Sequence, residues 1–393
     1  MLPTKVPANS VLDNKKRASL IAQKRQALNM TQKELSDAIG LPLYGERSIR
    51  RYEKGEVTIG DKIFNEIMSF PDTPPFISPK GAKYRSIDLF AGIGGIRLGF
   101  EQTNQVRTVF ASEWDKFAQK TYRANFGEVP QGDITQIDEK DVPDHDILLA
   151  GFPCQAFSQA GRKLGFNDTR GTLFFDVARI IKEKRPKAFL LENVKNLKSH
   201  DHGRTFKVIQ KTLEELEYDL HVMLFKARDF GAPQNRERIY LVGFDKNLDF
   251  SLPFLPPTPT KRPTSVGSIL EQGPIDERFT ISDKLWQGHQ NRKKAHQKKG
   301  NGFGYSLFNA HSPYTNTLSA RYYKDGSEIL IEQLGKNPRK LTPREAARLQ
   351  GFPEDFIIPV SNTQSYKQFG NSVCVLTINA IAEEMIKTLN SEI

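Results

Sequence analysis

A cysteine stands at a position where a sulfur nucleophile could act. Cys154 directly follows Pro153, just after the apolar stretch 146–151, which we interpret as a strand. The carboxyl ends of parallel strands form the usual reactive edge of an α/β sheet, and a thiolate is a strong nucleophile even when few thiols are ionised. A lone buried cysteine is also commonly an inert core residue, so its position alone does not decide between the two.

Charged side chains border two further apolar stretches. Glu192 follows the predicted strand 188–191, and Arg236 and Arg238 stand at the start of the predicted strand 239–243. These groups acquire a chemical meaning only beside a cofactor site, and an earlier part of the chain provides a candidate for one.

Three glycines follow the first predicted strand, 86–90. Gly92, Gly94 and Gly95 lie where that strand runs into a helical pattern. Glycine lets the backbone turn sharply and approach a ligand closely at a helix N-terminus. The pattern is GxGG rather than GxGxxG, which favours S-adenosylmethionine over the pyrophosphate cofactors NAD and FAD without excluding them.

Two acids and an aromatic residue suit a nucleoside. Glu113 lies eighteen residues after Gly95, at the end of the predicted strand 108–111, where a carboxylate can accept hydrogen bonds from both ribose hydroxyls. Trp114 can stack on adenine. Asp133, which we place at a third strand end, can accept from the adenine amino group. The alternative is a Rossmann-type core with incidental acids.

Composition limits the class of protein. The 393 residues are 38% hydrophobic, which suits two or three domains with sizeable cores, and the net charge of +11 favours a polyanionic partner. No apolar run of about 18 residues predicts a membrane span, and no apolar N-terminal stretch predicts secretion. Two cysteines provide neither a disulfide framework nor a four-cysteine zinc site. We therefore expect a cytoplasmic protein without a metal.

The elements around these residues alternate. From 84 to about 244, short apolar runs alternate with helical patterns, which indicates βαβ units and a mostly parallel sheet. The residues 71–81 hold four prolines and a glycine and suggest a stiff linker. Apolar spacing from 377 to 389 fits one helical face, and Cys374 just before it is interpreted as a core residue.

The residues before the linker resemble the helix-turn-helix of phage-repressor-like regulators. Arg47, Arg50 and Arg51 lie on the helix that follows the predicted turn 41–46, and in that family the second helix of the pair enters the major groove. The turn is about three residues longer than the family pattern, so the helix is expected to be tilted or to start later. The alternative is a helical docking domain with solvated arginines.

The rest of the chain, from 84 to about 390, resembles the DNA cytosine-5 methyltransferases of bacterial restriction–modification systems. The resemblance rests on an ordered series of short blocks, 88–95, 151–158, 168–174, 192–194, 234–238, 339–356 and 368–373. It implies an α/β fold with a Rossmann-like S-adenosylmethionine-dependent core. The expected domains are a helix-turn-helix domain (1–70), a linker (71–83), the catalytic domain (84–250 and 365–393) and a target-recognition domain with its hinge (251–364).

The resemblance also implies catalytic roles. Cys154 adds to C6 of cytosine, which makes C5 nucleophilic enough to accept a methyl group. Glu192 binds the base at N3 and the amino group, and Arg238 holds O2, with Arg236 close by. The base that removes the C5 proton is not identified. The cofactor residues implied are Phe90, Gly92, Ile93, Gly94, Gly95, Glu113, Trp114, Asp133, Ile134, Pro153, Leu173, Asn371 and Ser372.

Double-stranded DNA is the expected partner. A base inside a duplex must be flipped out to reach Cys154, and the stretch 159–167 is interpreted as a lid, or else an ordinary surface loop, whose Arg162 and Lys163 meet phosphates. The run 289–299 holds five basic residues and no acid, which suits phosphates, although many such runs are only solvated. The further expected DNA contacts are Arg292, Lys293, Lys294, Asn301 and Arg321.

The stretches 300–306 and 317–326 resemble the subgroup that methylates the inner cytosine of CCNGG or CCWGG. We expect a monomeric methylase that protects DNA from a partner endonuclease, and a dimer where the N-terminal domain binds an operator and regulates its own system. Two alternatives stay open: a tRNA cytosine-5 methyltransferase, and a DNA-binding regulator with an inactive core.

Overall fold

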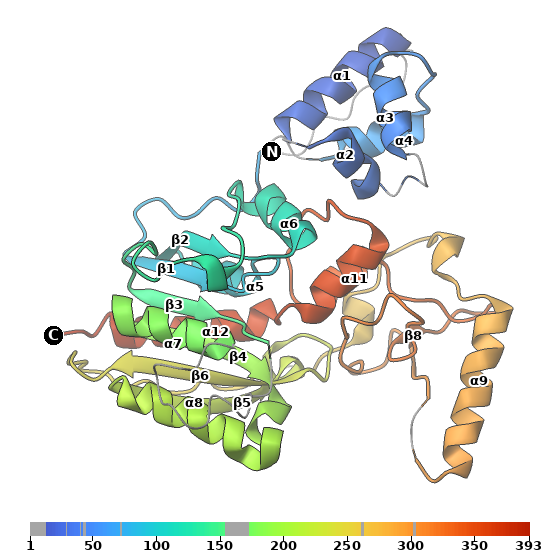
Figure 1. Ribbon diagram of the computed structural model, residues 1–393. Coiled ribbons are helices and arrows are strands. Elements are labelled where there is room, and N and C mark those ends of the chain that lie inside the picture. Colours follow the sequence, from blue (N-terminus) through green and yellow to red (C-terminus); the bar gives the residue numbers. More distant parts are fainter. Residues whose placement is uncertain are drawn as a thin grey trace.

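In the computed structural model the chain forms a helical N-terminal part, an α/β part and a smaller part, and the C-terminal helix returns to the α/β part (Figure 1). The structure describes residues 13–28, 30–39, 41, 45–70, 73–153, 173–260, 263–301 and 304–393. Cys154, Arg162, Lys163 and the predicted lid lie outside these residues. No helix among the described residues is long and apolar enough to cross a membrane.

The N-terminal part is all helical, as the sequence predicts. Its helices are α1 (Asn14–Ala27), α2 (Gln32–Ala38), α3 (Gly45–Glu53) and α4 (Asp61–Met68). Ile21, Leu35 and Ile49 are fully buried between them. Glu53, the last residue of α3, links this helix to α1 and α2, because its carboxylate accepts hydrogen bonds from Arg25 at 2.5 Å and from Gln32 at 2.7 Å. These bonds fix α3 on the domain.

A six-stranded sheet forms the centre of the molecule, in the order β2-β1-β3-β4-β6-β5. The first four strands are parallel, whereas β6 is antiparallel to both β4 and β5. The strands are β1 (Tyr84–Leu89), β2 (Val106–Ser112), β3 (Ile147–Ala150), β4 (Ala188–Val194), β5 (Tyr218–Lys226) and β6 (Glu237–Asp245). The predicted α/β fold is confirmed, and β5 is a strand that the sequence analysis did not predict.

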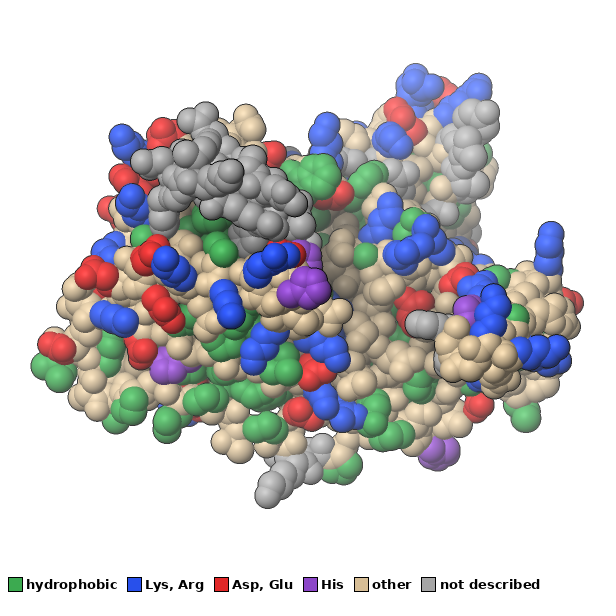
Figure 2. Space-filling view, turned by 60° about the horizontal axis from the view of Figure 1, so that its bottom comes forward, with side chains coloured by type: hydrophobic (Ala, Val, Ile, Leu, Met, Phe, Trp, Pro, Cys, Tyr) green, Lys and Arg blue, Asp and Glu red, His purple; other side chains and the backbone are tan. Residues whose placement is uncertain are grey.

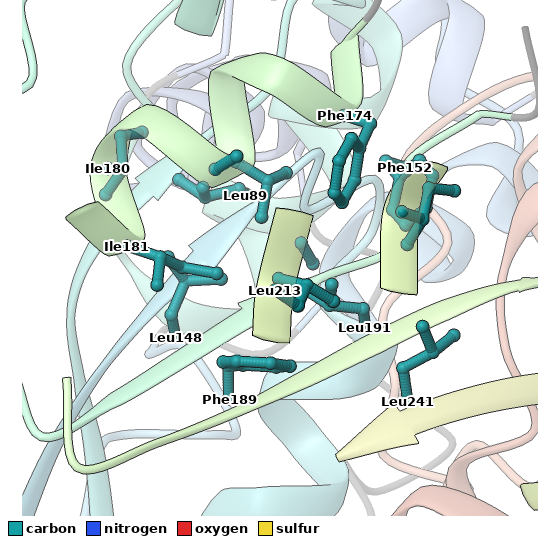
Figure 3. Close-up of a cluster of buried hydrophobic side chains, with 14 of the residues drawn as sticks. Leu89, Leu148, Phe152, Phe174, Ile180, Ile181, Phe189, Leu191, Leu213 and Leu241 are labelled. Atoms are coloured by element: carbon teal, nitrogen blue, oxygen red, sulfur yellow. The ribbon is translucent and has the colours of Figure 1, made fainter. Parts of the chain in front are cut away.

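Helices cover both faces of the sheet, because successive strand residues point to opposite sides. Leu148 and Leu191 pack with α7 (Leu173–Lys184) and α8 (Arg204–Glu215) on one face (Figure 3). Their neighbours Leu149 and Leu190 pack on the other face, with α5 (Gly95–Glu101) and α12 (Val375–Leu389). Near-continuous apolar runs are what a strand buried on both faces requires.

The smaller part has little regular structure, and its buried residues form one cluster with residues of the α/β domain such as Ile93 and Tyr122. Its elements are α9 (Asp283–Lys298), β7 (Leu307–Phe308), β8 (Leu330–Ile331) and α10 (Pro343–Leu349), and α11 (Asn362–Asn371) returns to the sheet. Tyr322, Leu341 and Phe356 are fully buried in it. A capping box between Thr342 and Glu345 starts α10. Helix α9, which covers most of the basic run, was not predicted from the sequence.

The Pro-rich segment lies on the α/β domain. The Phe76 amide donates to the Asn125 carbonyl at 3.0 Å, at the end of α6 (Lys116–Phe126). The Ser78 hydroxyl donates to Glu101 at 2.6 Å and accepts from Arg97 at 2.8 Å. Arg97 is fully buried on α5, so the segment is attached to the helix that begins at the glycine turn.

Candidate active site

One cavity of about 890 Å³ opens at the carboxyl edge of the parallel strands. It is bordered by the ends of β1, β2 and β4, by the start of β6, and by two segments from outside the sheet, 320–323 and 364–373. All the predicted cofactor residues are described, and all except Gly94 line this cavity, as do Glu192, Arg236, Arg238 and Arg321. The structure therefore brings together side chains that are up to 282 positions apart, from Phe90 to Ser372.

The glycine turn between β1 and α5 has two functions. Gly94 has a φ of 80°, and a Cβ atom there would lie 2.2 Å from the Phe126 ring, so glycine is required for packing. Gly92 has a φ of 55°, but a Cβ atom there would meet nothing within 4 Å. Phe90 also has a positive φ, of 55°, which is strained for a bulky residue. The open space beside Gly92 faces the cavity.

Glu113 is held in place by the backbone at the end of β2. One carboxylate oxygen accepts from the Gly92 amide at 2.8 Å, and the other accepts from the Asp115 amide at 2.8 Å. Burial raises the pKa of Glu113, while these amides lower it. Each carboxylate oxygen has a second lone pair, so the group retains acceptor capacity for a ligand.

Trp114 and Asp133 lie further out on the same wall. The Trp114 side chain is 75% exposed, which leaves its ring free for a partner. The expectation that Asp133 follows a third strand is wrong, because the chain makes only an isolated bridge at Gln131 there. Asp133 instead caps the 3-10 turn Ile134–Gln136 by accepting from the Thr135 amide at 3.0 Å.

Glu192 and Arg238 form the other end of the cavity. Antiparallel pairing places Arg238 opposite Val194, two residues after Glu192 on the same strand. This register brings the side chains of Glu192 and Arg238 together. Arg238 Nε lies 3.1 Å from Glu192 Oε1, yet this oxygen has no aligned hydrogen bond among the described residues. Burial raises the pKa of Glu192, against the lowering effect of Arg238 and Arg236. A buried carboxyl with unused hydrogen-bonding capacity suits a polar ligand edge.

Arg236 is placed differently from Arg238. Its guanidinium donates to the carbonyls of Leu318 and Gly370, each at 3.1 Å, and also to the Ser372 carbonyl. Burial, together with the charge of Arg238, lowers the pKa of Arg236 to about 9. Arg236 lines the cavity, but these bonds are those of a positioning residue, which joins the smaller domain to the cavity wall.

Two supporting residues were missed by the sequence analysis. Gln234 is fully buried; it accepts from the Leu318 amide at 2.9 Å and donates to the Leu349 carbonyl at 3.1 Å. Asn193 donates to the Phe152 carbonyl at 2.8 Å, next to the start of the cysteine segment. Both lie in blocks already singled out, Gln234–Arg238 and Glu192–Val194, but their partners are remote in sequence.

At Gly370 the two domains approach each other closely. A Cβ atom there would lie 2.3 to 2.4 Å from backbone atoms of Ser319 and Ala320. Because the neighbouring atoms are backbone, no side-chain rotation can make room.

The predicted DNA-contacting residues are mostly exposed. Arg47 and Arg50 project from α3 into solvent, while Arg51 lies 3.8 Å from Glu56. On α9, Lys294 is exposed and has no ion pair among the described residues. Three others are engaged within the domain: Arg292 pairs with Asp325 at 3.0 Å, the Lys293 ammonium lies 4.3 Å from the Tyr305 ring centre, and Asn301 bonds His296 at 2.7 Å.

Comparison with known proteins agrees with this geometry. The family model for C-5 cytosine-specific DNA methylase matches residues 84–387, and a helix-turn-helix family model matches residues 21–76. Type II methyltransferase M1.ScrFI from Lactococcus lactis subsp. cremoris is 68% identical over 94% of this chain and 95% of its own length. Type II methyltransferase M.SsoII from Shigella sonnei is 65% identical over 95% of this chain and 99% of its own length.

Among solved structures, the S. pombe Dnmt2 methyltransferase matches with a TM-score of 0.65 and 20% identity, over 78% of this chain and 99% of its own. A putative DNA modification methyltransferase encoded within an E. coli prophage matches with a TM-score of 0.59 and 24% identity, over 78% and 99%. At this identity the likeness concerns the fold alone.

Proposed function

This chain belongs to the C-5 cytosine-specific DNA methylase family, and from that premise we propose how it acts. It binds S-adenosylmethionine at the Glu113 end of the cavity and methylates C5 of a cytosine bound at the Glu192 end. The observation that carries the proposal is the single cavity shared by Glu113 and by the Glu192–Arg238 pair.

The Glu113 end fits an adenosine-containing cofactor on three grounds. Space is open beside Gly92, where a Cβ atom would meet nothing. Glu113 retains acceptor lone pairs for two hydroxyls, and the exposed Trp114 offers an aromatic face. When bound, S-adenosylmethionine supplies an electrophilic methyl group. Asn371 and Ser372 would close the site from the side of α11.

The base is activated by this chain's own groups. The Cys154 thiolate forms a bond to C6, which moves the ring electrons toward C5. Glu192 binds N3 and the amino group, and Arg238 binds O2, so both act where charge develops on the ring. After C5 is methylated, a base removes the C5 proton and the bond to Cys154 breaks. The role of Cys154 rests on its sequence motif.

Base flipping follows from the site's burial. Glu192 is only 8% exposed, so a base stacked in a duplex cannot meet it. Extruding a base costs a few kcal/mol, which contacts in the pocket offset. The target is the inner cytosine of CCNGG or CCWGG, a proposal supported by the resemblance of 300–306 and 317–326 to that subgroup. The enzyme acts as a monomer that protects DNA from a partner endonuclease.

Bisulfite sequencing of DNA from cells expressing the chain tests activity and target together. We expect conversion-resistant cytosines at one position of one short motif, and their absence with Cys154→Ser, which should still bind duplex DNA. Labelled S-adenosylmethionine supplied with duplex DNA and tRNA separately tests the substrate class. Label found only in tRNA would overturn the proposal.

A second function is favoured by α3. Its Arg47 and Arg50 are exposed on a helix whose position is fixed by Glu53, as a groove-entering helix requires. We propose that this domain binds an operator, as a dimer, and regulates the chain's own system. Footprinting upstream of the gene should show protection that Arg47→Ala with Arg50→Ala removes. Protection confined to methylation sites would contradict this role.

A further inference from the structure

A basic cluster follows β4 and is not used by the site described above. We call it the β4 exit patch: it consists of Lys195, Lys198, His202, Arg204 and Lys207, all of which are exposed. The segment 195–207 holds four Lys or Arg residues and one acid, Asp201, a formal charge of +3. A run of positive charge directly after Val194, which borders the cavity, suggests an anionic partner.

The loop that carries the patch is fixed rather than loose. It comprises two 3-10 turns, η4 (Lys195–Lys198) and η5 (His200–Gly203), and leads into α8. Leu197 anchors it with 1% exposure, and His200 Nδ1 lies 2.8 Å from the Thr205 hydroxyl. Asp201 has a φ of 51° and His202 a φ of 55°. Such backbone conformations cost free energy and persist only where the surroundings hold them.

Two lysines of the patch are available to an anionic partner. Lys195 pairs with Glu237 at 3.0 Å, and Arg204 pairs with Asp201. Lys198 and Lys207 have no ion pair among the residues that the structure describes. Their ammonium groups are therefore available to phosphate oxygens.

The patch lies beside the place where a base has to enter. Val194, the last residue of β4, lines the cavity directly before Lys195, and Arg321 and Tyr323 line it from the smaller domain. Figure 2 is turned so that the bottom of Figure 1 comes forward, and it shows Lys, Arg and His side chains near the middle of that face. DNA has a phosphate about every 3.4 Å along each strand, so a strand that delivers a base to Glu192 must carry phosphates past this rim.

We propose that the β4 exit patch, through Lys198 and Lys207, binds backbone phosphates of the DNA strand next to the extruded cytosine. This inference rests on the proposed methylation of duplex DNA. The contacts carry no sequence information; they position the strand over the cavity, opposite the recognition segments of the smaller domain.

The test compares two double charge reversals in the full chain, Lys198→Glu with Lys207→Glu and, as a control, Lys80→Glu with Lys246→Glu. Lys80 precedes β1 and Lys246 follows β6, so both controls lie at the opposite edge of the sheet, are exposed, and change the net charge equally. The measurement is KM for a short CCNGG-containing duplex in the methyl-transfer assay at several salt concentrations. KM is chosen because total DNA binding would include any contribution from α1–α4.

The patch variant should raise KM for DNA at least tenfold at moderate salt. Its slope of log KM against log salt should be smaller by roughly two, since each phosphate contact contributes about 0.9. Binding of S-adenosylmethionine by calorimetry should be unchanged in both variants, which shows that both are folded. A patch variant whose slope equals that of the control overturns the inference. Absence of methylation by the wild-type chain would instead remove the proposed function.

Discussion

Replacing Gly92 with alanine should separate cofactor binding from the stability of the glycine turn. A Cβ atom at Gly92 meets no atom within 4 Å, so the substitution creates no clash within the protein, and the amide that Glu113 accepts from is retained. The remaining cost is the left-handed conformation, with φ of 55°, which amounts to roughly 1–2 kcal/mol for an L-residue. Each kcal/mol should lower Tm by about 2–4 °C in a domain of this size.

The same methyl group would stand in the cavity that we assign to S-adenosylmethionine. We expect calorimetry to show a Kd for this cofactor at least about tenfold higher, equivalent to about 1.4 kcal/mol. Gly335→Ala is the matched control, because Gly335 has a φ of 70°, has no atom within 4 Å of its Cβ position, and does not line the cavity. It should lower Tm equally and leave the Kd unchanged. Wild-type affinity in Gly92→Ala would refute the placement of the cofactor.

Three further substitutions test the site and its supports, and a fourth, Gly288→Ala, serves as a control. Gly370→Ala should lower Tm and raise KM for DNA, because overlap with the Ser319 backbone costs about 3 kcal/mol; Gly288→Ala, in open space on α9, should stabilise by up to about 1 kcal/mol in thermal unfolding. Glu192→Gln should reduce kcat by roughly 10²–10⁴ while calorimetry shows unchanged cofactor affinity; a kcat near wild type would exclude Glu192 from the chemistry. Burial raises the pKa of Asp88 to about 8, above its value in the unfolded chain. The neutral carboxyl therefore contributes to the free energy of unfolding in full below about pH 4. This contribution is lost as the pH rises toward 8, by about 1.4 kcal/mol per pH unit. Asp88→Asn should flatten that part of the curve of unfolding free energy against pH, and an unchanged slope would contradict it.

Most of the fold could be predicted because its signals are local. The apolar runs that end before Gly151 and Glu192 are strands buried on both faces, and the predicted C-terminal helix is α12, whose apolar face is buried. The edge strand β5 was overlooked although Asp219 and His221 alternate with apolar neighbours as in a half-buried strand, because the apolar run Met223–Phe225 then interrupts that alternation. The helix α9 was hidden by its polar composition: of its side chains only His289 is buried, so the sequence carries no apolar periodicity from which this helix could be predicted.

The candidate site, like the fold, could be predicted only in part from the sequence. Glu113, Glu192 and Arg238 lie where motif order predicts, since each lies near one end of a strand of the sheet. The task of Arg236 was not predictable, because its three carbonyl partners lie 82 to 136 positions away. Lys293 was expected to contact a DNA phosphate, but its ammonium group lies over the Tyr305 ring, because that side of α9 faces its own domain.

The attachment of the Pro-rich segment limits how far the N-terminal helices can travel. Pro74 packs on Gly127, and Phe76 and Ser78 are hydrogen-bonded to the α/β domain. From Phe70 to Pro74 the chain has four residue steps, which span roughly 14 Å when fully extended. This length is little more than the width of a DNA major groove, about 12 Å. A duplex bound by α3 would consequently be held close to the α/β domain. A single chain could therefore regulate transcription and methylate DNA only at sites that lie near each other in space.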